Sequence, residues 1–409
     1  MLKTSSRSAY RSVWHACEAL ERRRLLAAVA WDGGGDGTNW SDANNWSSNA
    51  VPGAADDVTI DVPGAVTVLV RGAQPSVQSL VNRETLWLRG DNTFGNAAAS
   101  ISGNVTNDGT IKLESIDSTW SDTLSVGGVL SNSSTGVVQM NAGTGGQRFI
   151  TGNIDNSGAI STTSAFSGGA AGKTFNQMGG SVTASGGGSF AWASGTMNFS
   201  GGAFSGAVYV NGGSLSVAST AGAQTILVEG ASTLLSNDST AATVWVQGNN
   251  MVGGATLAIP GNATNNGTIR MESIDSSWSE TLNIGGVLSN SASGVIQVNA
   301  GTGGTRAING NINNSGTINT AVAVTAGASG KTFNQIGGTV TASGTGSFVW
   351  SSGTMNFSGG SFVGSVYLNG GSLSVASTAG AQTILVEGSS TLLSNDSTAA
   401  TVWVQGNSG

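Results

Sequence analysis

A short pattern returns along this chain at a fixed spacing: two apolar residues flank one variable residue and are followed by a polar residue and glycine. Three groups of copies, eighteen residues apart within each group, begin at Val68 and Leu86, at Val208, Ile226 and Val244, and at Val366, Ile384 and Val402. The alternation is typical of a half-buried β-strand, and the glycine indicates a turn. A strand that recurs at the length of one coil predicts a solenoid.

A longer duplication of 158 residues contains this ladder. Residues 211–248 and 369–406 are identical except that Ala231 is replaced by Ser389. Earlier in each copy, short strands recur at a longer spacing, and in the first copy they follow Gly109, Gly136, Gly158 and Gly180. We therefore expect an all-β fold, a single-stranded and right-handed parallel β-helix of about seventeen coils and roughly 80 Å.

Two other architectures would also accommodate a duplication. An antiparallel sandwich of about 158 residues per copy would not explain the eighteen-residue spacing. A left-handed helix of hexapeptides shares the coil length, but no six-residue rhythm is visible. A disordered chain would have fewer than the observed 38% hydrophobic residues and more than 9% charged ones.

The N-terminal segment differs from the rest of the chain in charge and composition. Residues 1–30 carry a net charge of +4 and end in Ala28-Val29-Ala30, which favours a helical export leader with a cleavage site. Their short apolar run leaves an ordinary N-terminal helix as the alternative. Residues 31–65, with three tryptophans, predict a cap over the open end of the solenoid. The solenoid then comprises 66–251, including the first long repeat (94–251), and the second long repeat, 252–409.

Two segments carry a resemblance to known families. The segment from Leu20 to Leu26, L-E-R-R-R-L-L, resembles the L-E-P-R-x-L-L motif of large secreted planctomycete-type surface proteins, with Arg22 where that family has proline. Residues 31–61 are similar to the opening segment of secreted haemagglutinin-like or autotransporter-like β-helical proteins. The resemblance implies a signal for export and a secreted or cell-surface, adhesin-like protein.

Several classes of function are excluded by composition. Beyond residue 30 the chain has 20 acidic and 9 basic residues, which disfavours nucleic acid and anionic membranes as partners. It contains no apolar stretch long enough for a transmembrane helix. His15 and Cys17 are the only residues of their types, so the solenoid can hold neither a Ser-His-Asp triad nor a Cys/His metal site.

One acidic cluster is a candidate for chemistry. It comprises Glu114, Asp117 and Asp122 in the first copy, and Glu272, Asp275 and Glu280 in the second. Such carboxylates could act as the acid/base pair of a sugar hydrolase or bind calcium, the one candidate cofactor. The alternative is a solvated loop, because acids and bases do not recur at coil spacing as a site built from stacked coils requires.

Basic partners for such a site are few. They are Lys112, Arg148 and Lys173, with the counterparts Arg270, Arg306 and Lys331. Lys112 and Glu114 share one strand face, as do Arg270 and Glu272, so we expect an ion pair at each place.

An aromatic row is the second candidate site. If Val244 and Val246 point inward, Trp245 points outward. Stacking then aligns Tyr209, Leu227 and Trp245, and further along Tyr367, Leu385 and Trp403. Such a stripe could bind sugar rings or a neighbouring protein. The alternatives are the inverse register, with the aromatic rings inside, or simple packing between coils.

Taken together, these features predict a secreted or cell-surface structural or adhesive β-solenoid without catalytic activity. The alternative is a carbohydrate-active β-helix, similar to a polysaccharide lyase or glycoside hydrolase, or a carbohydrate-binding one. An extracellular polysaccharide or a surface protein is the expected partner. The second repeat runs to Gly409 without an evident cap, so end-to-end self-association is also expected.

Overall fold

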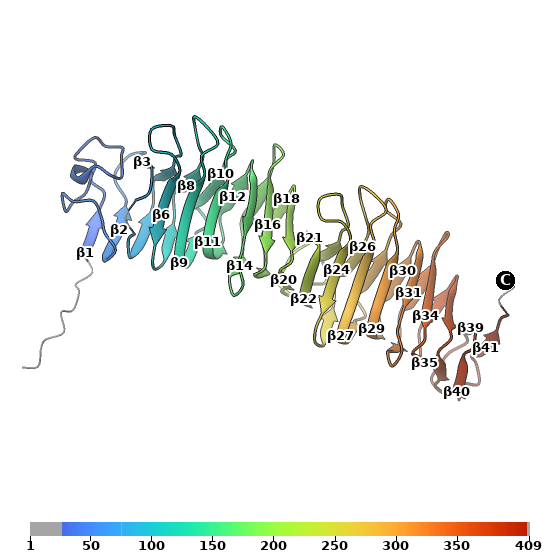
Figure 1. The fold of residues 1–409 in the computed structure, drawn as a ribbon. Coiled ribbons are helices and arrows are strands. Elements are labelled where there is room, and N and C mark those ends of the chain that lie inside the picture. The colour runs from blue at the N-terminus through green and yellow to red at the C-terminus, as the bar shows by residue number, and fades with distance from the viewer. Residues whose placement is uncertain (1–26, 75, 407–409) are drawn as a thin grey trace, which may run out of the picture.

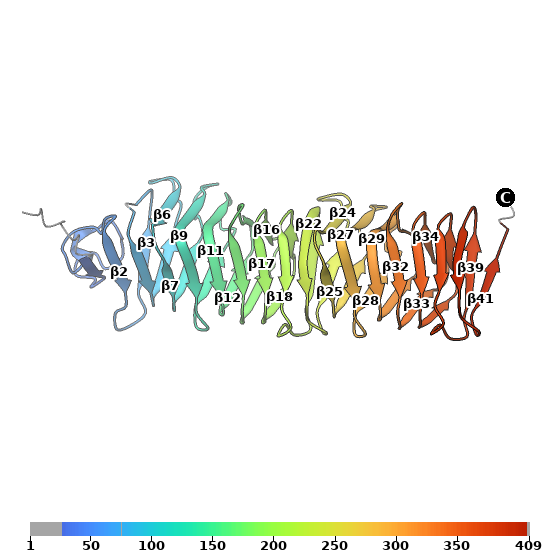
Figure 2. The same cartoon turned by 90° about the horizontal axis from the view of Figure 1, so that it is seen from below.

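The computed structural model describes residues 27–74 and 76–406, which form an elongated rod of stacked strands (Figure 1; Figure 2). The chain winds along it in about 16 turns, and neighbouring strands pair in parallel. The only helix in this part of the chain is one 3-10 turn, η1 (Ala43–Asn45). The described residues contain no helix that is long and apolar enough to span a membrane. The all-β parallel solenoid is confirmed. Eighteen residues are one turn, since Leu227 pairs with Trp245.

One column of strands runs along the whole rod, each strand bonded to the next. Several long strands contribute only their C-terminal halves. In order, the column contains β1 (Ala27–Ala30), β2 (Asp56–Ile60), β4 (Ser79–Asn82), β7 (Val105–Asn107), β9 (Asp122–Asn132), β11 (Arg148–Asn156), β14 (Thr174–Gln177), β17 (Thr196–Phe199), β20 (Ser214–Val217), β22 (Ala231–Asn237), β25 (Ala263–Asn265), β27 (Glu280–Asn290), β29 (Arg306–Asn314), β32 (Thr332–Gln335), β35 (Thr354–Phe357), β38 (Ser372–Val375) and β40 (Thr391–Asn395).

The other faces carry shorter columns. The first contains β3 (Thr67–Val70), β5 (Thr85–Leu88), β8 (Thr110–Leu113), β10 (Val137–Met140), β12 (Ala159–Thr162), β15 (Ser181–Ala184) and β18 (Ala203–Ser205). The second contains β13 (Ala165–Gly168), β16 (Ser189–Ala193), β19 (Val208–Asn211), β21 (Thr225–Glu229), β23 (Thr243–Val246), β26 (Thr268–Met271), β28 (Val295–Val298), β30 (Thr317–Thr320), β33 (Thr339–Ala342) and β36 (Ser361–Val363). The remaining strands are β6 (Ala97–Ile101), β24 (Ala255–Ile259), β31 (Ala323–Ala326), β34 (Ser347–Ser351), β37 (Val366–Asn369), β39 (Thr383–Glu387) and β41 (Thr401–Val404).

Near the boundary between the two long repeats, one column of strands ends and another takes its position in the repeat. The column that starts at β3 ends at β18. The column of β16 then continues through β19, β21 and β23 into β26, which is the counterpart of β8 in the second repeat. The eighteen-residue coils are therefore the junction between repeats, and the coil that follows them is longer.

Inward and outward residues alternate along most strands. In β23, Val244 and Val246 are fully buried, whereas Trp245 between them is only half-buried. The inward residues of all coils form one continuous apolar core. In the wider coils aromatic rings fill it, with Phe175 stacked 5.2 Å from Phe190 and 5.5 Å from Trp192, centroid to centroid. Each coil thus completes the core of its neighbours.

A column of buried amide side chains lies inside the continuous strand column. Asn82, Asn107, Asn132, Asn156 and Gln177 follow one another, and each amide donates to the side-chain oxygen of the next at 2.8–2.9 Å. A second such column begins at Asn237, near the end of the first copy, and continues through the second copy to Gln335. A buried amide without a partner is costly, so a shift of one coil against the next would leave these groups unpaired.

Tryptophans cover the N-terminal end of the core, as expected of a cap. Trp31, Trp40 and Trp46 are at most 2% exposed. The rings of Trp31 and Trp40 pack against that of Trp46, with centroids 4.9 and 4.7 Å away. The Trp46 indole also donates to the Trp40 carbonyl at 2.8 Å, so its one polar atom is satisfied inside the core.

The leader expected over residues 1–30 overlaps the fold at its end. Residues 27–30 form β1, which pairs with β2, so the last residues assigned to the leader belong to the solenoid. The apolar alternation of Ala28-Val29-Ala30, which suits a cleavage site, also suits a strand, and Val29 is buried. Residues 1–26, with the expected helix and the seven-residue export motif, lie outside the described residues.

The amide column predicts different costs for one substitution at two equivalent places. The Asn237 amide donates to Asn265 at 2.6 Å, whereas Asn395, its counterpart in the second copy, is exposed. Asn237→Ala should cost about 1–3 kcal/mol of unfolding free energy, because the buried Asn265 oxygen loses its donor. Asn395→Ala should change it by less than about 0.5 kcal/mol. Urea unfolding of both variants tests this, and equal losses would contradict the structural role of the column.

Candidate functional site

The residues of the aromatic row expected from the sequence are aligned, but Tyr209 is buried, at 7% exposed. Strand pairing stacks Tyr209 on Leu227 and Leu227 on Trp245, and likewise Tyr367 on Leu385 and Leu385 on Trp403. Because Val244 and Val246 are buried, the prediction that Trp245 faces outward is confirmed, and the inverse register is wrong for this strand.

Trp245 also packs between coils. Its indole nitrogen donates to the carbonyl of Glu272 at 3.1 Å, and the guanidinium of Arg270 lies 4.0 Å from the ring centroid. Trp87, 158 residues earlier, makes the same contacts, and the Lys112 ammonium lies 4.0 Å from its ring. One side of each ring is therefore occupied by a cation of the next coil.

Loops arch over one side of the rod in two regions along its length (Figure 1). One set of arches lies at 89–96, 114–121 and 141–147, and a second set lies 158 residues later, at 247–254, 272–279 and 299–305. Successive arches are bonded to one another. The Trp120 indole donates to the Asn92 side chain at 3.1 Å, and the Thr144 hydroxyl donates to the Ser118 carbonyl at 2.8 Å.

A buried arginine holds the arches of the first copy together. Arg148 and Asp122 are both fully buried, with their closest nitrogen and oxygen atoms 3.3 Å apart. The Arg148 guanidinium also donates to the carbonyls of Trp120 at 3.1 Å, Asn141 at 2.8 Å and Ala142 at 2.9 Å. From sequence, Arg148 is a candidate basic partner for catalysis; in the structure its hydrogen bonds are all made inside the scaffold, away from solvent.

The second copy keeps this arrangement with a longer acid. Arg306 and Glu280 approach to 2.6 Å and are equally buried. Burial raises the pKa of Asp122 to about 6 and that of Glu280 to about 7, although the neighbouring guanidinium opposes the shift in each case. Desolvation therefore outweighs the attraction within the pair, as is common for buried ion pairs.

The other members of the acidic cluster have separate partners. Glu114 lies 3.1 Å from the Lys112 ammonium, and Glu272 accepts from Arg270 at 2.6 Å, so both expected ion pairs are confirmed. Asp117 and Asp275 each accept from a backbone amide of the preceding arch at 3.2 Å. Within residues 27–74 and 76–406, no three His, Cys, Asp or Glu side chains are grouped so that they could hold a metal ion.

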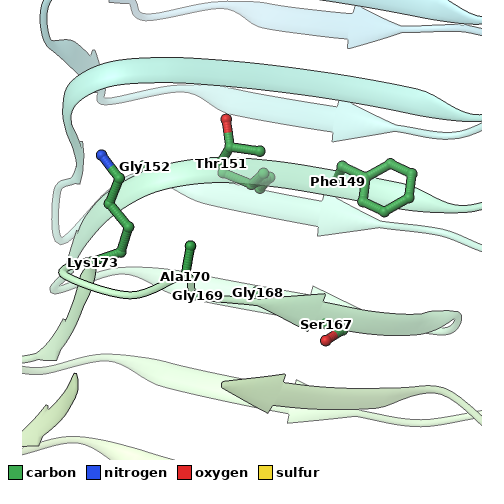
Figure 3. Close-up of a pocket in the computed structure, with 9 residues that line it drawn as sticks. Phe149, Thr151, Gly152, Ser167, Gly168, Gly169, Ala170 and Lys173 are labelled. Carbon is green, nitrogen blue, oxygen red and sulfur yellow. The ribbon is translucent and has the colours of Figure 1, made fainter. Parts of the chain in front are cut away.

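Lys173 lies at one end of a shallow hollow of about 100 Å3 (Figure 3). Phe149, Thr151 and Ser167 line it with several glycines, and no carboxylate or imidazole is among these lining residues. Lys331 lines a hollow of about 340 Å3 in the second copy, beside Asn283 and again without a carboxylate. Neither hollow therefore offers its lysine the acidic partner that lyase or hydrolase chemistry would require.

A larger cavity, of about 420 Å3, lies where the eighteen-residue coils meet the first arched coil of the second copy. Its side walls include the aromatic row of Tyr209, Leu227 and Trp245, and its rim includes Met251 and Ile274, which the first and second arches expose to 78% and 40%. Its polar lining includes Glu229, Gln247, Asn249 and Asp275. We call this cavity the junction groove. Its volume lies in the range of small-molecule sites.

The most unusual group in the junction groove is the carboxyl of Glu229. The residue is 4% exposed; one oxygen accepts from the Asn249 amide at 2.7 Å, and the other has no hydrogen-bond partner. Burial raises the pKa of Glu229 to about 7, with the Asp275 carboxylate adding to the shift and Asn249 opposing it. A buried and half-satisfied carboxylate is costly unless something compensates it.

Sequence reasoning missed Glu229, Asn249 and Met251. Glu229 ends an alternating strand, where the other coils of this type also have one polar turn residue, so nothing local distinguishes it. The signal that could have found them is the change in spacing after Gly248. Ile269 pairs with Val244, and it comes later in the chain than the eighteen-residue spacing would place it. A longer coil must project a loop beside its shorter neighbour.

Comparison with known proteins finds no match among protein-family models, curated proteins or solved structures.

The buried arginine predicts a large and specific loss of stability. Arg148→Met removes the charge, so Asp122 loses its counter-ion and several carbonyls lose their donor. Unfolding should therefore require about 3–5 kcal/mol less free energy. Adding Asp122→Asn should recover part of that loss. Arg83→Met is the matched control, because the Arg83 side chain is 50% exposed and bonds only exposed or half-exposed acids. Urea unfolding measures all three, and an equal effect at Arg83 would contradict the role given to Arg148.

Proposed function

We propose that the protein is a secreted or cell-surface structural and adhesive rod without catalytic activity. This proposal rests on one observation: the buried polar and charged side chains of the protein serve to join its coils. The amide column and the Arg148–Asp122 pair join one coil to the next inside the rod. The outward side chains of most strands are small or half-buried and follow one another at coil spacing. Such a scaffold suits an extended, repetitive surface.

Export is the part of the proposal that rests on sequence. The L-E-R-R-R-L-L motif from Leu20 to Leu26 resembles a motif near the N-terminus of secreted planctomycete-type surface proteins, and the segment around it is basic. The low charge and acidic balance of the rest of the chain suit a secreted protein in salty surroundings.

A carbohydrate-active enzyme is less well supported. Such a site needs a carboxylic acid and a second carboxylate, or a base, at a fixed separation around one bond. The acids of the sequence cluster instead bind their own lysine, arginine or backbone partners. The junction groove is compatible with a rod that binds a polysaccharide without turnover.

The proposal is tested with the full-length protein on pectin, alginate, chondroitin, chitosan and cellulose, with and without calcium. We expect retention on at least one of these polysaccharides and no release of unsaturated or reducing ends. Release that disappears in a Glu114→Gln/Glu272→Gln variant would overturn the non-catalytic part. Retention on none of them, and on no intact cell surface, would overturn the adhesive part.

A further inference from the structure

We infer that the junction groove binds a chain of amino sugars and holds one ammonium group of that chain against Glu229. This inference rests on the proposed adhesive function and names the chemical class to which the rod adheres. The ligand class follows from the charge, shape and backbone pairing of the groove.

The coils 158 residues earlier, just before the first long repeat, show what a compensated version of this place contains. The residues 158 positions before Glu229, Gln247 and Asn249 are Arg71, Arg89 and Asp91. The carboxylate of Asp91 lies 3.5 Å from both guanidinium groups. In the junction groove the single carboxylate, Glu229, stands at the position of Arg71. The neutral amides of Gln247 and Asn249 stand at the positions of Arg89 and Asp91, so neither arginine has a counterpart. One Glu229 oxygen is left buried without a hydrogen-bond donor.

The charge of the junction groove also favours a cation. Glu229 and Asp275 both line it, and no lysine or arginine is among its lining residues. Two carboxylates in a partly enclosed cavity repel polyuronates and sulfated chains and attract an ammonium group. Arg270, which follows Trp245 in the row, lies over its ring and accompanies Glu272. Arg148 lines the adjoining hollow, but it is paired with Asp122. A ligand ammonium would therefore supply the partner that the chain does not.

Shape and backbone pairing favour a sugar chain over a peptide. The groove continues along the rod into a second hollow of about 270 Å3, which shares Ser189, Tyr209 and Met251 with it. Coils recur about every 4.8 Å, close to the length of one sugar unit. The strands that carry the aromatic row, β19, β21 and β23, are paired on both sides, so they offer no free edge to an added peptide strand. Aromatic walls suit the apolar faces of sugar rings.

The second copy offers matched controls, because its sequence is nearly identical. Glu387 corresponds to Glu229 and Tyr367 to Tyr209. Glu387 is half-exposed, and among the described residues no arch follows β41 to close a groove above it. A variant at Glu387 therefore changes the same residue type in the same local sequence outside the groove.

The test uses calorimetric titration of the full-length protein with a β-1,4-linked glucosamine hexamer. Glu229→Gln should weaken binding about tenfold or more, since a charge-assisted hydrogen bond is lost, whereas Glu387→Gln should leave it within about twofold. Strand register places Gln247 beside Glu229. Gln247→Arg should then fill the empty partner position, abolish binding and raise the unfolding temperature, which separates loss of the site from loss of the fold.

Cellohexaose and hexalysine distinguish the ligand classes. We expect both to bind at least tenfold more weakly than the glucosamine hexamer, because the first lacks the ammonium and the second lacks sugar rings. Equal binding of cellohexaose would overturn the role of Glu229, and equal binding of hexalysine would overturn the sugar assignment. If polysaccharide retention persists but Glu229→Gln and Glu387→Gln behave alike, this inference fails while the adhesive function stands.

Discussion

Hydrogen bonds between neighbouring coils are the constraint on which the rest of this structure depends. A single coil has strands of about four residues, no enclosed core and two open edges. Its apolar side chains are buried only when the coils before and after it are in place. Val246 is fully buried beneath the strand that contains Met271, whereas Val404, with the same local sequence, is 72% exposed. Position in the stack, and not local sequence, decides what is core.

The same constraint accounts for the groove. Coils of equal length stack with continuous faces and leave little hollow between them. At the junction of the long repeats, eighteen-residue coils meet a longer coil, whose extra residues can only rise as an arch. The arch bonds to its successors, and the buried Arg148 and Arg306 hold the two sets in place. The cavity beside Tyr209 and Glu229 is thus a consequence of a change in coil length. The duplication copies these residues as Tyr367 and Glu387, but no longer coil with an arch follows them in the described residues.

Much of this was predictable from sequence because period-two alternation and coil spacing are local signals. They predicted the parallel solenoid, the stacking of Tyr209, Leu227 and Trp245, and the Lys112–Glu114 ion pair. They did not predict that Arg148 lies inside, since a charged residue at the start of a strand is normally solvated and only the arches above it supply the carbonyls that it bonds. Nor could they find Glu229, whose burial depends on residues twenty and more positions away.

Native-state hydrogen exchange tests the dependence on neighbouring coils most directly. The strand pairs β21–β23 and β39–β41 have the same sequence, but β23 is paired on both sides and β41 on one. The amides of Thr243 and Gln247 donate to the coil of β21, and those of Thr401 and Gln405 donate in the same way to the coil of β39. If stacking decides stability, the first two should exchange at least about a hundredfold more slowly than the second two, in line with local opening of the less covered coil. Equal protection of the two coils would show that each is stable on its own sequence and would contradict the account.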